Sequence, residues 1–158
     1  MKKYELIIND FIEIDGEKLF RIKAIVDFSN TKSGDLGGYI SDESNLSHSS
    51  GNAWVSGDAA VFGNARVSGD AKVSGNAKVS GKAIVSGKAE VYGKAWVSGK
   101  ANVSEDAAVL GDATVLGDAT VSGKARVSGN AWVSGNAEVS DDALIFDDAK
   151  VSNIEEKK

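Results

Sequence analysis

From Gly51 to Ser152 the chain repeats a unit of six residues: Gly, a polar residue, Ala, any residue, Val and Ser. The aliphatic residue recurs at seventeen consecutive positions, every sixth residue from Val55 to Val151, without an insertion. Self-similarity at a fixed short period is typical of stacked-repeat architectures, and it restricts the fold more than any other feature. A disordered Gly/Ser linker, the alternative for such a composition, has no reason to keep an aliphatic residue in register.

The six-residue unit predicts a short strand, Ala-x-Val, followed by a corner, Ser-Gly-polar. Alternation along the strand directs Ala and Val to the same side and the residue between them to the other side. Glycine suits the corner because it adopts backbone angles that β-branched residues avoid. A strand this short cannot bury its apolar side alone, so successive units must stack. The sequence therefore predicts an all-β, single-stranded parallel β-helix.

Residues 3–28 carry larger side chains than the repeats and predict a small antiparallel β unit. Alternating residues favour strands at 4–8, 12–14 and 20–26, and Asp15-Gly16 is a hairpin-turn signal. Stacked-repeat proteins need an atypical end, so we expect this unit to cover the first turn, packing against Trp54 and Phe62. The predicted division is a cap and joint at 1–39, the β-helix at 40–152 and a charged tail at 153–158.

The joint contains a turn-rich segment, Gly34 to Gly38, and the six-residue pattern begins weakly after it. Ile40, Ser44 and Leu46 stand where Val, Ala and Val stand in later units. Nine residues separate Leu46 from Val55 instead of six, so three extra residues are expected to bulge out around His48.

The repeat resembles the hexapeptide pattern of left-handed parallel β-helix proteins, and the match covers about two thirds of the chain. Residues 19–24, 34–40 and 45–48 also resemble a group of bacterial and phage-encoded hexapeptide-repeat proteins that are often labelled transferases. The resemblance implies a left-handed coil of three hexapeptides, about six coils in all. It also implies assembly through the sides of the prism, and for enzymatic members a histidine general base between subunits.

If a turn has eighteen residues, outward side chains eighteen apart form columns on three faces. Two columns depart from the usual Ser, Lys or Asn by carrying large apolar residues. We interpret them as an apolar strip for protein contact, because Trp and Tyr anchor interfaces and a contiguous apolar patch marks one. The strip contains Tyr92, Trp96, Leu110, Thr114, Leu116, Trp132 and Phe146. A platform on which a ligand stacks, and ordinary surface, are the alternatives.

Chemistry-bearing residues are few. His48 is the only histidine, and it is the candidate general base if the chain is an acyltransferase. Four carboxylates late in the repeats could hold a hard cation, although we favour charge protection of the terminal sheet edge. These are Asp141, Asp142, Asp147 and Asp148. The chain has no cysteine, so disulfides and thiolate metal sites are excluded, and no motif indicates a cofactor.

The formal net charge of −5, with Lys and Asp interspersed, argues against a nucleic-acid binder. An acidic rod that mimics DNA is a further alternative, which the alternating lysines disfavour. No apolar run has the length of a membrane span and no signal peptide is evident, so we expect a cytoplasmic protein, in the host cytoplasm if phage-encoded. We predict a non-enzymatic binding or scaffold protein that either forms a homo-oligomer (dimer or trimer) or binds, or inhibits, a host protein.

Overall fold

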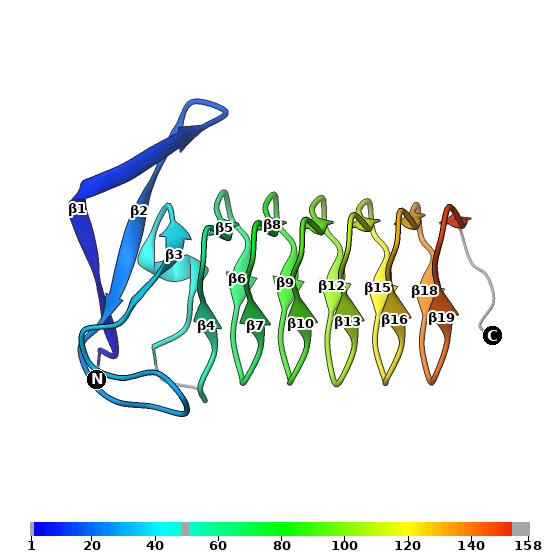
Figure 1. The fold of residues 1–158 in the computed structure, drawn as a ribbon. Helices are drawn as coiled ribbons and strands as arrows, with labels where there is room; N and C mark the ends of the chain where they lie inside the picture. The colour runs from blue at the N-terminus through cyan, green and yellow to red at the C-terminus, as the bar shows by residue number, and fades with distance from the viewer. Residues whose placement is uncertain (1, 49–50, 153–158) are drawn as a thin grey trace.

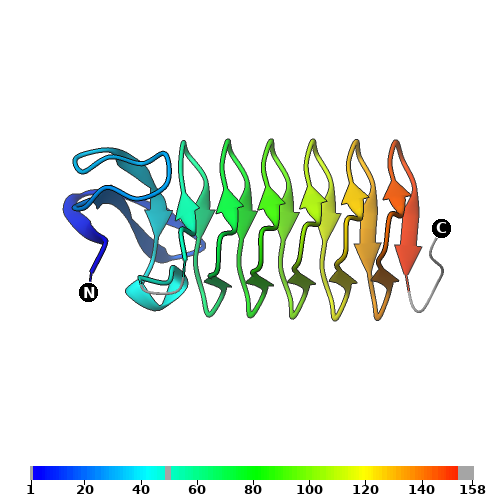
Figure 2. The ribbon, with the colours of Figure 1, turned by 90° about the horizontal axis from the view of Figure 1, so that it is seen from below.

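The computed structural model describes residues 2–48 and 51–152, and its architecture is almost entirely β. Most of the chain winds into about six turns that follow one another along a single axis (Figure 1). The antiparallel hairpin lies at the N-terminal end of this stack, and the last turn lies at the opposite end (Figure 2). The predicted parallel β-helix is confirmed.

Each turn contributes one short strand to each of three parallel faces. Face A contains β5 (Ala60–Val61), β8 (Lys78–Val79), β11 (Trp96–Val97), β14 (Thr114–Val115), β17 (Trp132–Ser134) and β20 (Lys150–Ser152). Face C contains β6 (Arg66–Val67), β9 (Ile84–Val85), β12 (Asn102–Val103), β15 (Thr120–Val121) and β18 (Glu138–Val139). Face D contains β4 (Trp54–Val55), β7 (Lys72–Val73), β10 (Glu90–Val91), β13 (Ala108–Val109), β16 (Arg126–Val127) and β19 (Leu144–Ile145).

The register between turns confirms the predicted eighteen-residue period. Val97, for example, lies between Val79 and Val115 in face A. The inward Val and Ala residues are buried along nearly the whole stack, so the core is a column of small aliphatic side chains. Backbone bonds between turns hold the stack together, as where the Trp96 N–H donates to the carbonyl of Ala113 at 3.0 Å.

Corners of the stack require a left-handed backbone, which glycine supplies at most of them. Glu105, Asp141 and Asp147 occupy three corners instead, with φ of 60°, 59° and 58°. A hydrogen bond offsets the unfavourable backbone conformation of Glu105, because its Oε1 accepts the backbone N–H of Gly123 in the next turn at 2.8 Å. At this corner the acidic side chain therefore bonds directly to the corner of the next turn.

The N-terminal hairpin has two strands, β1 (Tyr4–Ile14) and β2 (Glu17–Ala24), joined at the predicted turn. Asp15 and Gly16 both have positive φ, 51° and 81°, as a tight hairpin turn requires. The prediction of three strands in this region is wrong. The first two predicted strands are one continuous strand, in which the pairing register shifts between Ile7 and Phe11.

Strand β3 (Leu36–Ile40) joins the hairpin to the solenoid in one sheet, antiparallel to β2 and parallel to β5. We expected Gly37 and Gly38 in a turn, but they lie inside this strand. A Cβ at Gly37 would come within 2.5 Å of the Val55 carbonyl oxygen, and one at Gly38 equally close to that of Ala59. The two glycines therefore allow β3 to lie directly against the first full turn.

A single 3-10 turn, η1 (Glu43–Asn45), follows β3. Leu46 is buried and pairs with Val67, as its place in the repeat predicts. Ser44 is exposed and Asn45 is fully buried, however, so the expected inward position of Ser44 is wrong. The 3-10 turn moves the buried position from Ser44 to Asn45. The Asn45 amide fills the space there and is hydrogen-bonded. No helix in the described ranges is long and apolar enough to cross a membrane.

Two aromatic residues of the first full turn pack against the hairpin and its connections, as predicted. Trp54 contacts the rings of Tyr4 and Phe28 at centroid distances of 6.3 and 5.3 Å. Phe62 belongs to a second buried cluster with Leu19 and Tyr39. The N-terminal unit therefore covers one end of the stack with larger side chains than the repeats use. The predicted tail at 153–158 lies outside the described residues.

Candidate interaction surface

Face A carries the most conspicuous exposed aromatic residues of the solenoid. Trp96 and Trp132 point outward from β11 and β17, and each is 44% exposed. Thr114 lies between them in direct strand register, so the two tryptophans are two turns apart, about 10 Å. Leu116 follows Val115 on the same face. We call the four residues Trp96, Thr114, Leu116 and Trp132 the Trp face.

The indole of Trp96 leans over the preceding turn. Its Nε1 donates to Ser80 Oγ at 3.3 Å, and Ser80 is only 8% exposed, whereas the corresponding Ser98 and Ser134 are half-buried. The Lys78 ammonium lies 5.8 Å from the ring centroid. One hydrogen bond and one cation–π contact therefore orient this ring before any partner binds.

Trp132 has a similar setting two turns later. It lines a shallow hollow of about 290 Å³ together with Leu116 and Lys150. The Lys150 ammonium lies 6.0 Å from the ring centroid. Both tryptophans are thus partly immobilised on a rigid sheet, which lowers the conformational entropy lost when a partner covers them.

The other three predicted strip residues, Tyr92, Leu110 and Phe146, form a column at the ends of the face D strands. Tyr92 and Leu110 are neighbours and half-buried, but Ser128 separates them from Phe146. Phe146 shares a hollow with Leu144, which is 57% exposed and which we did not select from the sequence. Its signal was present, since Leu144 is a large apolar residue at an outward position of the repeat. The predicted strip is therefore interrupted at Ser128 in this column.

His48 stacks on Tyr4, with ring centroids 4.0 Å apart and planes 14° apart. Its Nδ1 accepts the backbone N–H of Lys3 at 3.2 Å, and its Nε2 lies 2.9 Å from Glu43 Oε1. Because Nδ1 accepts, Nε2 carries the proton and donates it to the carboxylate. Neither ring nitrogen is free to take a proton from a substrate, so this geometry favours a structural role. The other residues of the predicted bulge, 49–50, lie outside the described residues.

The histidine is part of a buried polar network beneath the hairpin. Tyr4 is fully buried and its hydroxyl donates to the Leu46 carbonyl at 2.7 Å. Burial raises the pKa of this phenol well above its ordinary value. Lys3 is 5% exposed, its Nζ donates to the Ala53 carbonyl at 2.8 Å, and burial lowers its pKa. These bonds anchor the start of β1 to the first turns.

Glu43 gives this network a pH dependence. The hydrogen bond from His48, helped by the Lys2 ammonium at 3.2 Å, lowers the pKa of the Glu43 carboxyl below its ordinary 4.5. A carboxyl whose pKa is lowered by folding stabilises the protein above about 4.5, and that contribution is lost as the pH falls through the folded-state value. We expect the stability difference between the parent and Glu43→Gln, measured by urea unfolding, to shrink below pH 4.5.

The matched control is Glu90→Gln, because the Glu90 side chain is exposed on face D and makes no hydrogen bond or ion pair among the described residues. It should change the unfolding midpoint little at any pH. Parallel curves for the parent and Glu43→Gln from pH 7 to pH 3 would contradict the assigned role of Glu43.

The late carboxylates do not converge on a common point. Asp141, Asp142, Asp147 and Asp148 are all exposed, and within residues 2–48 and 51–152 no three His, Cys, Asp or Glu side chains come together as a metal site would need. Asp148 Oδ1 instead accepts the side-chain amide of Asn130 at 3.3 Å. Their arrangement matches a charged rim at the last turn.

A known family model matches part of the solenoid. Residues 125–141 match the family model described as the YdcK beta solenoid repeat. This segment contains β16, β17 and β18, one strand from each face, and it includes Trp132. No curated protein matches the chain. The chain is therefore a β-helix repeat protein by both sequence pattern and structure.

Proposed function

We propose that this protein is a non-enzymatic binding protein that self-associates through its Trp face. The observation that carries the proposal is the order of outward residues up face A. This order is Lys78, Trp96, Thr114, Trp132 and Lys150, all in direct strand register. The series reads the same in both directions along the stack, and symmetric dimers are built from such self-complementary surfaces.

A second copy related by a two-fold axis through Thr114 would run antiparallel to the first. Trp96 of each copy would then lie opposite Trp132 of the other, and the two Thr114 side chains would meet at the axis. Lys78 of one copy would lie opposite Lys150 of the other at the two ends of the contact, where both ammonium groups stay in water. The arrangement buries the apolar centre and leaves the charged residues at its rim, as in stable interfaces.

The first test replaces both tryptophans. We expect the double variant Trp96→Ser, Trp132→Ser to raise the dimer dissociation constant at least about thirty-fold, since each anchor contributes at least about 1 kcal/mol. Sedimentation velocity measures this, with circular dichroism to confirm an unchanged β spectrum. Ile84→Ser is the control, because Ile84 is a 38% exposed apolar residue on face C. A parent protein that is monomeric at tens of micromolar, about the range of weak interfaces, would refute self-association.

A cysteine cross-link tests the two-fold axis itself. The chain has no cysteine, so a single introduced thiol can pair only between copies. Thr114→Cys should form a disulfide-linked dimer under mild oxidation. Thr120→Cys is the matched control, because it is the same residue type at the same strand position on face C and is equally half-buried. Equal cross-linking of the two variants would rule out this axis.

The resemblance to bacterial and phage-encoded hexapeptide-repeat proteins supports a second occupant, a host protein bound or inhibited by the same face in the cytoplasm. A monomeric parent would favour it. The occupied ring nitrogens of His48 give the transferase alternative no support. A DNA mimic would present columns of negative charge, whereas face A carries Lys78 and Lys150 at both ends of its aromatic centre.

A further inference from the structure

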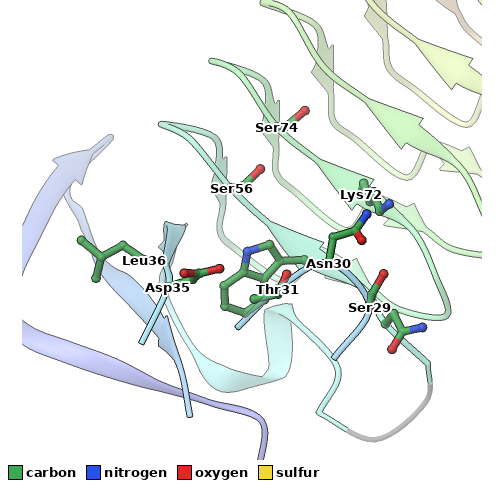
Figure 3. A pocket seen from close by; sticks show the side chains of 10 residues that line it. Ser29, Asn30, Thr31, Asp35, Leu36, Ser56, Lys72 and Ser74 are labelled. Carbon is green, nitrogen blue, oxygen red and sulfur yellow. The ribbon is translucent and has the colours of Figure 1, made fainter. Parts of the chain in front are cut away.

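A groove lies where the loop between β2 and β3 overhangs the first two turns of face D (Figure 3). Its volume is about 440 Å³. Asn30, Thr31 and Asp35 line it from the loop, and Ser56 and Ser74 line it from successive turns of the solenoid. None of the Trp face residues lines this groove, so the groove is separate from the proposed dimer surface.

The loop is held in one conformation by its own hydrogen bonds. Asp27 Oδ1 accepts the Ser33 N–H at 2.8 Å, and Asp35 Oδ2 accepts the Lys32 N–H at 2.9 Å. Phe28 and Thr31 exchange two backbone hydrogen bonds, at 2.9 and 2.7 Å. A groove wall that is already ordered loses little conformational entropy when a ligand binds.

Trp54 is the one buried residue that borders the groove, at 8% exposure. Its indole N–H has no hydrogen-bond partner among the described residues, which is unusual for a buried tryptophan. No fully buried side-chain nitrogen or oxygen in the described chain lacks a partner, so Nε1 must lie on the small exposed part of the ring. That part borders the groove, which therefore contains an unpaired donor held in place by the Phe28 and Tyr4 rings.

The remaining lining groups restrict what can bind. Hydroxyls and amides predominate, and the one carboxylate, of Asp35, is balanced by the one ammonium, of Lys72. A phosphate or nucleotide would require clustered cations or a helix N-terminus, and the groove has neither. Groups that both donate and accept hydrogen bonds suit a neutral ligand rich in hydroxyls.

We propose that this groove binds a neutral saccharide of about two sugar units, a size that fits the lower part of the usual range of ligand sites. The Trp54 N–H donates to a ring or hydroxyl oxygen of the sugar. Asp35 Oδ1 accepts a sugar hydroxyl, because Oδ2 is already bonded to Lys32. Leu36, which is 54% exposed at the rim, contacts the apolar face of the sugar ring.

Nuclear magnetic resonance of the full chain tests this directly. The three indole N–H groups give separate signals, and Trp54→Phe identifies the one from Trp54 by its loss. We expect maltose, cellobiose, lactose or N,N′-diacetylchitobiose to shift this signal in a saturable manner, with the Trp96 and Trp132 signals unchanged. Asn30→Ala and Lys72→Ala should each weaken the binding several-fold. Both residues are exposed, so neither variant threatens the fold.

Arg66→Ala is the matched control, because Arg66 is an exposed cation at the same position of the repeat on face C. It should leave saccharide binding unchanged. Three results would each overturn the proposal. The first is no shift of the Trp54 signal with any of the four sugars up to about 50 mM, well above weak millimolar binding. The second is a shift of this signal when free glycine or lysine is added in place of a sugar. The third is a sugar-induced shift of this signal that persists in both groove variants. None of them bears on dimerisation.

Discussion

Asn45→Ala is expected to lower the free energy of unfolding by about 4 kcal/mol, because several buried polar groups would lose their partners together. The Asn45 side chain is fully buried. Its Oδ1 accepts the N–H groups of Ser41 and Asp42, and its Nδ2 donates to the carbonyls of Gly63 and Ala65. Each backbone group left unpaired inside the protein costs about 1–3 kcal/mol, less where water can enter the space.

Urea unfolding followed by circular dichroism measures the loss. Asn64→Ala is the control, because Asn64 is an exposed corner residue whose side chain makes no hydrogen bond among the described residues. The control should change the free energy of unfolding by less than about 0.5 kcal/mol. A loss below about 1 kcal/mol for Asn45→Ala would show that the amide does not connect η1 to the solenoid as described.

Val97→Asp is expected to be more damaging, with a loss of about 5 kcal/mol or more. Val97 is completely buried between Val79 and Val115, with no polar partner for a carboxyl group. An uncompensated carboxyl in such a core must lose its hydration or its charge, and both are costly. Because each turn is stabilised mainly by its neighbours, a break in the middle also uncouples the turns on either side.

The same measurement applies, and here the shape of the transition is informative. We expect unfolding at a much lower urea concentration, or two separate transitions for the two halves. Asn102→Asp is the control, since Asn102 points outward from the next strand and has nearly the same size as aspartate. Retention of a single transition near the parent midpoint by Val97→Asp would contradict the inward assignment of the Val column.

The period of the repeat predicted the solenoid well because two local rules decide it. Alternation directs Ala and Val inward, and glycine at the corner permits the left-handed backbone, so Val97 could be placed without a structure. The cap was harder to predict. The register shift between Ile7 and Phe11 joins two predicted strands, and nothing in the local sequence marks it.

The candidate sites show the same difference between residues in the repeats and residues in the non-repeating part of the chain. Trp96, Thr114 and Trp132 share a column because residues eighteen apart stack on the same face. Their register is confirmed. The hydrogen-bonded position of His48 and the groove beside Trp54 could not be predicted, because both depend on how a non-repeating loop folds back onto the first turns. Asn45 shows the same limit, since its burial results from a 3-10 turn that interrupts the pattern.

The constant register between turns makes the length of this molecule adjustable. Each block of eighteen residues adds about 4.8 Å to the axis and returns every face to the same orientation. Duplication or loss of one block between β5 and β11 would therefore change the separation of the Trp54 groove and the Trp face without rotating one relative to the other. The solenoid therefore sets the distance between the two proposed binding surfaces in fixed steps, independently of their chemistry.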